Sequence, residues 1–223
     1  MNIQLNGWED YFNLPILENT LLALEMFPEK DICPRREDTF RAFKLCNPKK
    51  CKVITVSMDP YPQPGIATGV AFGNKVTTLP NKISSSLRVI RRAVLNPLEP
   101  INGPRIFDIS LEDWAKQGVL LLNAALTVRV GEPGSHILLW RPFMEDFLKE
   151  FSSKQQGCVY LFFGKQAEYY KNFIHPNNKI MEVYHPAYYA RIGKDMDSKV
   201  FDEINDYLIK QYGREEQIKW FRE

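Results

Sequence analysis

Residues 52–61, Lys52-Val53-Ile54-Thr55-Val56-Ser57-Met58-Asp59-Pro60-Tyr61, decide the fold of this chain. They begin with an apolar, β-branched run that is typical of a buried strand, and a loop rich in Gly and Pro follows them. A buried strand that ends beside an acidic residue places a carboxylate at the carboxyl edge of a sheet. Because open α/β proteins bind their ligands at this edge, Asp59 is the first candidate functional residue.

Three further apolar segments, residues 118–122, 159–163 and 179–183, also have the length and composition of buried strands. Together with the first segment they alternate with amphipathic stretches, which predicts an α/β fold with a four-stranded, mostly parallel sheet sandwiched between helices. The serines at 84–86 are expected to cap one of these helices. The predicted helices span residues 8–26, 38–46, 87–95, 111–116, 138–151, 166–173 and 197–212. In the first of them, the expected buried face consists of Leu14, Leu21, Leu22 and Met26.

The size and charge of the chain favour one ordinary globular domain over residues 1–223, since 44% of the residues are hydrophobic and 25% are charged. The net charge of +2 produces no strong global field, so an anionic partner would need a local basic patch. No apolar run approaches the roughly 20 residues of a membrane span. The N-terminus lacks the layout of a signal peptide, and we expect an intracellular protein, cytoplasmic or, in a eukaryote, nuclear.

The four cysteines give no indication of a metal or a disulfide framework. None belongs to a C-x-x-C pair, and their spacing matches neither common ferredoxin pattern. We therefore expect reduced, packed thiols and no metal site. The cysteines are Cys33, Cys46, Cys51 and Cys158.

Polar residues follow the ends of three predicted strands. Asp59, Asn123 and His185 each lie just past a different strand, so all three are expected at one edge of the sheet. Taken singly, an Asp before Pro, an Asn after a strand and a His before Pro are most often turn or structural residues. Together with Tyr61 and Phe72 in the first loop, however, they describe a pocket for a flat polar heterocycle. An amide binds its edge, a ring stacks on its face, and an imidazole supports negative charge on a leaving group.

The motifs around these residues match a known family. The chain resembles the uracil-DNA glycosylases of the uracil-N-glycosylase superfamily, most closely the classical family, from about residue 38 to residue 194. The family motif Gly-Gln-Asp-Pro-Tyr-His reads Ser-Met-Asp-Pro-Tyr-Pro at 57–62, and Phe72 keeps the family spacing. Residues 114–128 nearly reproduce a second family pattern, and Ser135 follows in a Ser-His pair. The last motif, His-Pro-Ser-Pro-Leu-Ser, appears as His-Pro-Ala-Tyr-Tyr-Ala at 185–190.

The resemblance implies hydrolysis of the N-glycosidic bond of deoxyuridine in DNA, with release of uracil after base flipping, as in base-excision repair. It implies no metal and no cofactor. Asp59 would stabilise the oxocarbenium-like sugar and orient the attacking water. His185, uncharged, would donate a hydrogen bond to uracil O2.

The resemblance also implies residues that bind the base and the DNA. Asn123 would recognise the uracil edge, Phe72 would stack on the base, and Tyr61 would exclude the 5-methyl group of thymine, with Met58 beside them. Tyr189 stands where the family inserts a Leu into the base stack. The expected DNA contacts are Pro62, Ser86, Ser135, Ala187, Tyr188, Tyr189 and Arg191.

Departures from the family motifs leave alternatives open. Ser57, Met58, Pro62, Ala187 and Tyr188 differ from the family residues. A second hypothesis is therefore a protein of the same fold with weak or no catalysis, acting as a DNA-binding accessory subunit or as a decoy for glycosylase inhibitor proteins. A third is an enzyme with another lesion preference. The expected partners are uracil-containing DNA and, in addition, protein inhibitors of uracil-DNA glycosylases, and the expected state is a monomer.

Overall fold

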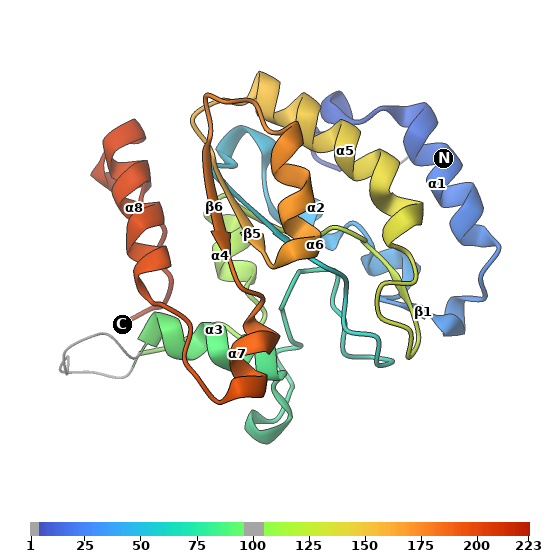
Figure 1. Cartoon of the computed structure of the whole chain (residues 1–223), viewed down its shortest axis with the longest axis horizontal. Coiled ribbons are helices and arrows are strands. Elements are labelled where there is room, and N and C mark those ends of the chain that lie inside the picture. The colour runs from blue at the N-terminus through green and yellow to red at the C-terminus, as the bar shows by residue number, and fades with distance from the viewer. Residues whose placement is uncertain (1–4, 96–104) are drawn as a thin grey trace.

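The computed structural model describes residues 5–95 and 105–223. Its centre is a four-stranded sheet with the strand order β3-β2-β5-β6, and every pairing in it is parallel (Figure 1). This confirms the predicted four-stranded sheet and each of its strands to within one residue. The strands are β2 (Val53–Ser57), β3 (Val119–Asn123), β5 (Val159–Phe163) and β6 (Lys179–Val183).

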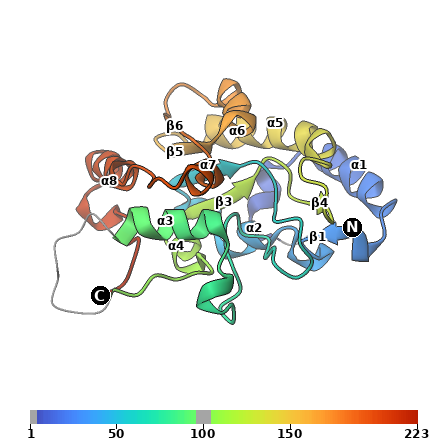
Figure 2. The ribbon, with the colours of Figure 1, turned by 60° about the horizontal axis from the view of Figure 1, so that its bottom comes forward.

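Helices cover both faces of the sheet, as Figures 1 and 2 show. Alternate side chains of each strand enter one of two hydrophobic cores. Leu120 and Leu122 pack in the core that includes α1 (Leu14–Glu25) and α5 (Ile137–Lys154). Val119 and Leu121 pack in the opposite core, with α3 (Ser85–Leu95), α4 (Glu112–Lys116) and α8 (Lys199–Tyr212).

The predicted first helix, residues 8–26, is divided in the structure. A 3-10 helix, η1 (Trp8–Tyr11), precedes α1, which begins after Asn13. The Asn13 side chain accepts a hydrogen bond from the Ile16 backbone N–H at 3.4 Å, and Pro15 stands in the first turn, so both residues favour a new helix start. The predicted buried face was largely wrong: the residues that α1 buries are Leu17, Thr20 and Leu24, whereas Leu14, Leu22 and Met26 are exposed.

Several elements were not expected from the sequence. The predicted helix 38–46 shortens to α2 (Arg41–Leu45), and two short strands, β1 (Ile32–Cys33) and β4 (Val128–Arg129), form a separate antiparallel pair. An unpredicted helix, α7 (Pro186–Ile192), packs against α3. The predicted helix 166–173 becomes α6 (Lys165–Glu168) followed by a 3-10 helix. The 3-10 helices after η1 are η2 (Glu29–Asp31), η3 (Arg36–Asp38), η4 (Pro48–Lys50), η5 (Pro80–Lys82), η6 (Tyr169–Phe173) and η7 (Arg214–Glu216).

The C-terminal segment closes one of the two cores. Trp220 is buried against Trp114 and Phe201, at ring-centroid distances of 4.9 Å and 5.1 Å. The Trp114 indole N–H donates to the backbone carbonyl of Trp220 at 2.9 Å, and Ile106 pairs with Arg222 in an antiparallel bridge. The last residues are therefore part of the fold.

The four cysteine thiols are free and buried, as expected. Among residues 5–95 and 105–223, no helix combines the length and the apolar character needed to cross a bilayer. The same residues contain no cluster of three or more His, Cys, Asp or Glu side chains suited to a metal ion.

Candidate active site

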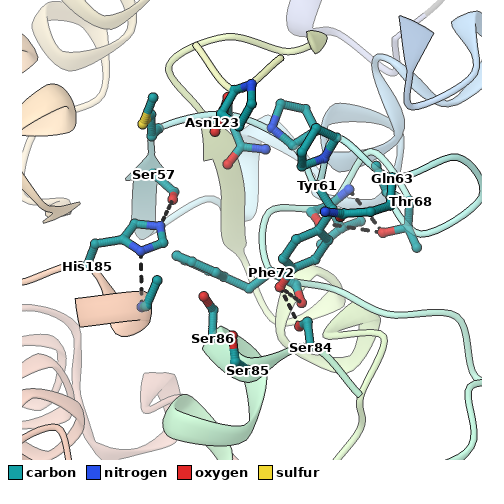
Figure 3. Close-up of a pocket in the computed structure, with 18 of the residues that line it drawn as sticks. Ser57, Tyr61, Gln63, Thr68, Phe72, Ser84, Ser85, Ser86, Asn123 and His185 are labelled. Carbon is teal, nitrogen blue, oxygen red and sulfur yellow. Dashed lines mark hydrogen bonds between the residues drawn. The ribbon is translucent and has the colours of Figure 1, made fainter. Parts of the chain in front are cut away.

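A cavity of about 500 Å³ opens at the carboxyl ends of the sheet strands. Ser57 and Asn123, the last residues of β2 and β3, are direct register partners, so their side chains lie next to each other on one face of the sheet. Side chains from the three loops beyond β2, β3 and β6 surround the same space (Figure 3). The cavity brings together most of the predicted site residues, namely Met58, Asp59, Tyr61, Pro62, Phe72, Ser86, Asn123, His185 and Ala187.

Asp59 is held by the backbone of a distant loop. Its Oδ2 accepts a hydrogen bond of 2.5 Å from the Gly134 N–H. Burial raises the pKa of the Asp59 carboxyl above its usual value, and the Gly134 hydrogen bond opposes that shift. Gly134 has φ +81°, and a Cβ at this position would stand 3.2 Å from the Met58 methyl group. The Met58 thioether therefore packs toward Gly134 and leaves the cavity open.

His185 stands two residues after β6 and is the N-cap of α7. Its Nδ1 accepts the Ala187 backbone N–H at 3.1 Å, so in the uncharged imidazole the proton is on Nε2. This Nε2 lies 3.1 Å from the Ser57 hydroxyl oxygen (Figure 3). Burial lowers the pKa of His185, which keeps the ring uncharged at neutral pH.

The contact between His185 and Ser57 spans the strand that separates them. In the sheet order, β5 lies between β2 and β6, and Gly164 directly follows its last residue, Phe163. A Cβ on Gly164 would stand only 3.1 Å from the His185 Cβ. The glycine therefore leaves the room that lets His185 reach across the end of β5 to Ser57.

Phe72 and Tyr61 form the aromatic wall of the cavity. Phe72 has φ +64°, an uncommon conformation for a residue with a side chain, and its ring packs edge-on against Phe163 at 5.0 Å. The Tyr61 hydroxyl donates to the Phe72 carbonyl at 3.1 Å and pairs with the Ser84 hydroxyl at 2.6 Å. Burial raises the pKa of Tyr61 to about 12, so the phenol stays protonated. These contacts fix both rings before any ligand binds.

The side-chain amide of Asn123 lines the cavity and is available for a ligand. The residue is 8% exposed, and its side chain has no hydrogen bond to protein within the described residues. A buried amide without protein partners retains its capacity to donate and to accept. This suits the edge of a heterocycle that carries both kinds of group.

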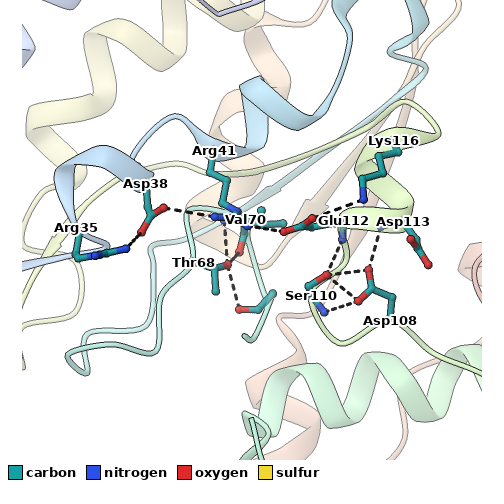
Figure 4. Close-up of polar contacts among 11 residues, drawn as sticks. Arg35, Asp38, Arg41, Thr68, Val70, Asp108, Ser110, Glu112, Asp113 and Lys116 are labelled. Carbon is teal, nitrogen blue, oxygen red and sulfur yellow. Dashed lines mark hydrogen bonds and ion pairs between the residues drawn. The ribbon is translucent and has the colours of Figure 1, made fainter. Parts of the chain in front are cut away.

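The loop that carries Phe72 is anchored by polar contacts around Arg41 (Figure 4). The Arg41 guanidinium forms an ion pair of 2.6 Å with Glu112 and a longer one of 3.6 Å with Asp38. The Ala42 N–H donates to the Gly69 carbonyl at 3.2 Å, and a Cβ on Gly69 would collide with the Asp38 backbone. Helices α2 and α4 thus hold the loop from outside the cavity.

Four predicted DNA contacts lie outside the residues that line the cavity: Ser135, Tyr188, Tyr189 and Arg191. The Ser135 hydroxyl accepts the Arg129 N–H at 2.9 Å. Tyr188 is 37% exposed, its ring lies 5.0 Å from that of Tyr184, and the Arg191 guanidinium is 5.7 Å from its centroid. Tyr189 is partly buried against the core that includes α3 and α8.

Sequence reasoning overlooked three residues of the site. Ser57 was interpreted only as an altered motif position, Ser84 as part of a helix start that attracts phosphate and not as a partner of Tyr61, and Gly134 was not considered. Their contacts depend on loops that are distant in sequence: 128 residues separate Ser57 from His185, and 75 separate Asp59 from Gly134. The available signal was the position of Ser57 at the end of the strand that leads to Asp59.

The chain is similar in sequence to proteins of known activity. The family model described as "Uracil DNA glycosylase superfamily" matches residues 43–209. The chain is 32% identical to the uracil-DNA glycosylase of Mesomycoplasma hyopneumoniae, over 88% of this chain and 86% of the relative. It is 31% identical to the uracil-DNA glycosylase of Alkaliphilus metalliredigens, over 99% of this chain and 96% of the relative.

Solved structures show the same fold. The crystal structure of mimivirus uracil-DNA glycosylase superposes with a TM-score of 0.72, at 19% identity, and the match covers 96% of this chain and 89% of that one. The crystal structure of UNG from Nitratifractor salsuginis gives a TM-score of 0.68 at 24% identity, covering 90% of this chain and 92% of that one. Both superpositions support the parallel sheet between helix layers.

Proposed function

The chain belongs to the uracil-DNA glycosylase superfamily, and we propose that it hydrolyses the N-glycosidic bond of deoxyuridine in DNA and releases uracil. The observation that carries this proposal is the convergence of Asp59, Asn123 and His185 on one cavity. The target nucleotide must leave the duplex, because the sugar–base bond is inaccessible inside the stack. A cavity of about 500 Å³ has room for one extruded base.

Asp59 serves the sugar side of the reaction. As the glycosidic bond lengthens, positive charge develops on the sugar, and a partly buried carboxylate stabilises it more strongly than one in water. The Gly134 N–H fixes one carboxylate oxygen and leaves the other available to orient the attacking water. The reaction on this account requires neither a protein nucleophile nor a metal.

His185 serves the base side. Uracil is a poor leaving group until the negative charge on its oxygen is stabilised. The imidazole is uncharged, and the Ala187 N–H keeps its proton on Nε2, which faces the cavity. A preorganised donor at this place stabilises the departing anion without protonating it fully.

The other residues that line the cavity make the site selective for uracil. The Asn123 amide recognises the edge of the base, and Phe72 stacks on its face. Tyr61, fixed by Ser84 and the Phe72 carbonyl, excludes a 5-methyl group by steric clash. Met58 completes the wall near Gly134.

The DNA backbone is expected to cross the mouth of the cavity. Pro62, Ser86 and Ala187 lie at the cavity itself, and Ser86 is in the first turn of α3. Beyond the cavity, Tyr188, Tyr189 and Arg191 belong to α7, and we propose that an α7 tyrosine replaces the extruded base in the stack. Tyr188 has the more exposed ring, while Tyr189 needs to leave its core contacts to act as the wedge.

A cleavage assay tests the proposal. The protein is incubated without added metal with single-stranded and U:G duplex oligonucleotides, and abasic sites are detected on a gel after alkaline cleavage. We expect product from uracil oligonucleotides and none from the same sequence with thymine. Binding is also expected to weaken as salt rises, because phosphate contacts release counterions.

Negative outcomes of this assay separate the alternatives. DNA binding without product would favour an accessory DNA-binding role, and loss of both product and binding would favour a decoy for inhibitor proteins. Variants of mimivirus UNG have been crystallised in complex with UGI. We infer that an inhibitor protein of this kind covers the cavity mouth of this chain, so that adding UGI would stop product formation.

A further inference from the structure

We propose that Ser57 is a further catalytic residue, whose hydroxyl donates a hydrogen bond to the base oxygen on which negative charge develops. The proposal rests on the glycosylase function proposed above and makes the Ser57 hydroxyl the link through which the Nε2–H of His185 acts on the base. In the family motif this position is Gly, so the hydroxyl is a feature of this chain's own sequence.

The hydrogen-bond inventory of Ser57 points to a ligand. Because Nδ1 of His185 accepts the Ala187 N–H, Nε2–H is the donor to the Ser57 oxygen at 3.1 Å. The serine thereby acts as acceptor, and its own O–H hydrogen remains. In the described parts of the chain, Nε2 of His185 is the only hydrogen-bond partner of this hydroxyl. Ser57 is 1% exposed and lines the cavity, so an acceptor for this hydrogen has to approach from the cavity side.

The position of the hydroxyl matches the place of the base. Ser57 lines the cavity, lies beside Asn123 in register, and faces the same space as His185 and Phe72 (Figure 3). A base read by Asn123 and stacked on Phe72 therefore has an edge next to Ser57. Its carbonyl oxygen is the acceptor that the free O–H hydrogen lacks.

The imidazole strengthens this donor. A hydroxyl that accepts a hydrogen bond becomes a better donor, because the two bonds polarise each other in a site of low dielectric. His185 and Ser57 then form one chain, from the Ala187 N–H through the ring to the hydroxyl and the base. No proton is transferred, because hydrogen bonds alone stabilise the charge on the base oxygen.

The test compares single-turnover cleavage of a uracil oligonucleotide by the wild type, Ser57→Ala and Ser57→Cys. Both variants lose the strong donor, and the cysteine keeps nearly the same volume. We expect the rate of bond cleavage to fall about a hundredfold, as for other single donors to a developing anion. The dissociation constant for the DNA, measured under the same conditions, should change less than threefold.

Thr55→Val is the matched control. Thr55 lies two residues earlier on the same face of β2, and its buried hydroxyl oxygen, unlike that of Ser57, has no hydrogen-bond partner in the described structure. Its removal should leave the cleavage rate unchanged. Comparable melting temperatures for all variants would confirm that they fold. If the wild type itself releases no uracil, the proposed function fails, whereas an active wild type with an equally active Ser57→Ala overturns only the role of Ser57.

A double-mutant cycle tests the connection to His185. If the two residues act in one hydrogen-bond chain, Ser57→Ala combined with His185→Ala slows cleavage by less than the product of the two single effects. Rate losses that multiply in full would contradict the chain.

Discussion

At the scale of single residues, the site keeps Asp59 ionised in surroundings that disfavour its charge. Burial raises the pKa of the carboxyl, and among the described residues the Gly134 N–H is the one group that opposes this. Relative to the unfolded chain, the ionised Asp59 therefore lowers the stability of the native state at neutral pH. The same partly dry environment makes the carboxylate effective beside a cationic sugar. Function and stability conflict at this residue.

Asp59→Asn separates the two effects. The amide oxygen still accepts from Gly134, but no charge is buried, so we expect a higher melting temperature together with cleavage slower by orders of magnitude. Because the pKa of Asp59 is raised in the native state, its protonated carboxyl stabilises the fold. This contribution is complete below pH 3.8, the ordinary pKa, and is lost as the pH rises through the native pKa. The gain from Asn should therefore shrink as the melting experiment is moved from pH 7 toward pH 4. A variant less stable than the wild type at pH 7 would contradict this account.

The pH dependence of cleavage reports the protonation of His185. His185 must be uncharged to donate from Nε2 alone, and burial lowers its pKa below the ordinary 6.5. The single-turnover rate should thus be constant at neutral pH and fall in acid, with the His185 step below 6.5 and the Asp59 step above 3.8. His185→Gln, which cannot titrate, should lack the first step. An acid limb centred above 6.5 would show that burial does not control the ring.

Tyr61 gives a prediction about specificity. Its ring packs against the cluster of Cys33, Ala67 and Val128, and its hydroxyl is hydrogen-bonded to Phe72 and Ser84, so it cannot move aside for a methyl group. Tyr61→Ala should admit thymine and release it from T-containing oligonucleotides at a measurable rate. Tyr61→Phe, which keeps the ring, is the control and should continue to reject thymine. If Tyr61→Ala retains uracil cleavage without any thymine release, the steric assignment is wrong.

At the scale of secondary-structure elements, the ends of the strands determine the site. β2 and β3 end in side chains that enter the cavity, whereas β5 is followed directly by Gly164. With φ +82° and a Cβ position 3.1 Å from the His185 Cβ, this glycine allows the β6–α7 turn to approach. The start of α7 then places the Ala187 N–H on Nδ1 of His185. β5 and α7 therefore orient the imidazole, although neither contributes a catalytic side chain.

Gly164→Ala should displace His185 and slow cleavage by about tenfold or more, since a 1 Å misplacement near the reacting atoms has effects of this order. Gly193→Ala is the matched control. Gly193 also has a positive φ, +64°, but a Cβ there meets open space. Gly193→Ala should lose about 1–2 kcal/mol of stability through left-handed backbone strain, and Gly164→Ala should lose more, because φ +82° with ψ 167° is open essentially only to glycine; urea denaturation measures both. Only Gly164→Ala should lose activity at a temperature where both are folded, and equal activities would refute the proposed displacement.

At the scale of the whole molecule, the sheet separates two cores that are closed in different ways. α1 and α5 cover one face, while the other depends on α3, α8 and the C-terminal segment around Trp220 (Figures 1 and 2). The Trp220 ring fills the space between Trp114 and Phe201. Part of the core behind the site is thus completed by the last residues of the chain.

Trp220→Ala should lower the free energy of unfolding by about 3–5 kcal/mol, the usual cost of removing a buried aromatic ring. Trp220→Phe keeps part of the packing and should lose less. Urea denaturation followed by circular dichroism measures both variants, and cleavage of uracil DNA at low temperature should be close to that of the wild type. A loss below 1 kcal/mol for Ala would mean that the segment only rests on the surface.

The sequence by itself determined the parallel sheet and the polar residues at its edge. Buried parallel strands are continuous apolar runs, so β2, β3, β5 and β6 are recognisable locally, and the residue after each run falls at the same edge. Helix ends and exposed faces were predicted less well, as the divided first helix shows, because packing selects among locally acceptable helices.

Only the tertiary structure decided which side chains touch. His185 reaches Ser57 because of the strand order β3-β2-β5-β6, the glycine that follows β5 and the turn into α7. The loop before α5 brings the Gly134 N–H to Asp59. These contacts join residues 128 and 75 positions apart. No local pattern encodes them, because strand order and loop conformation follow from the simultaneous packing of both helix layers on the sheet.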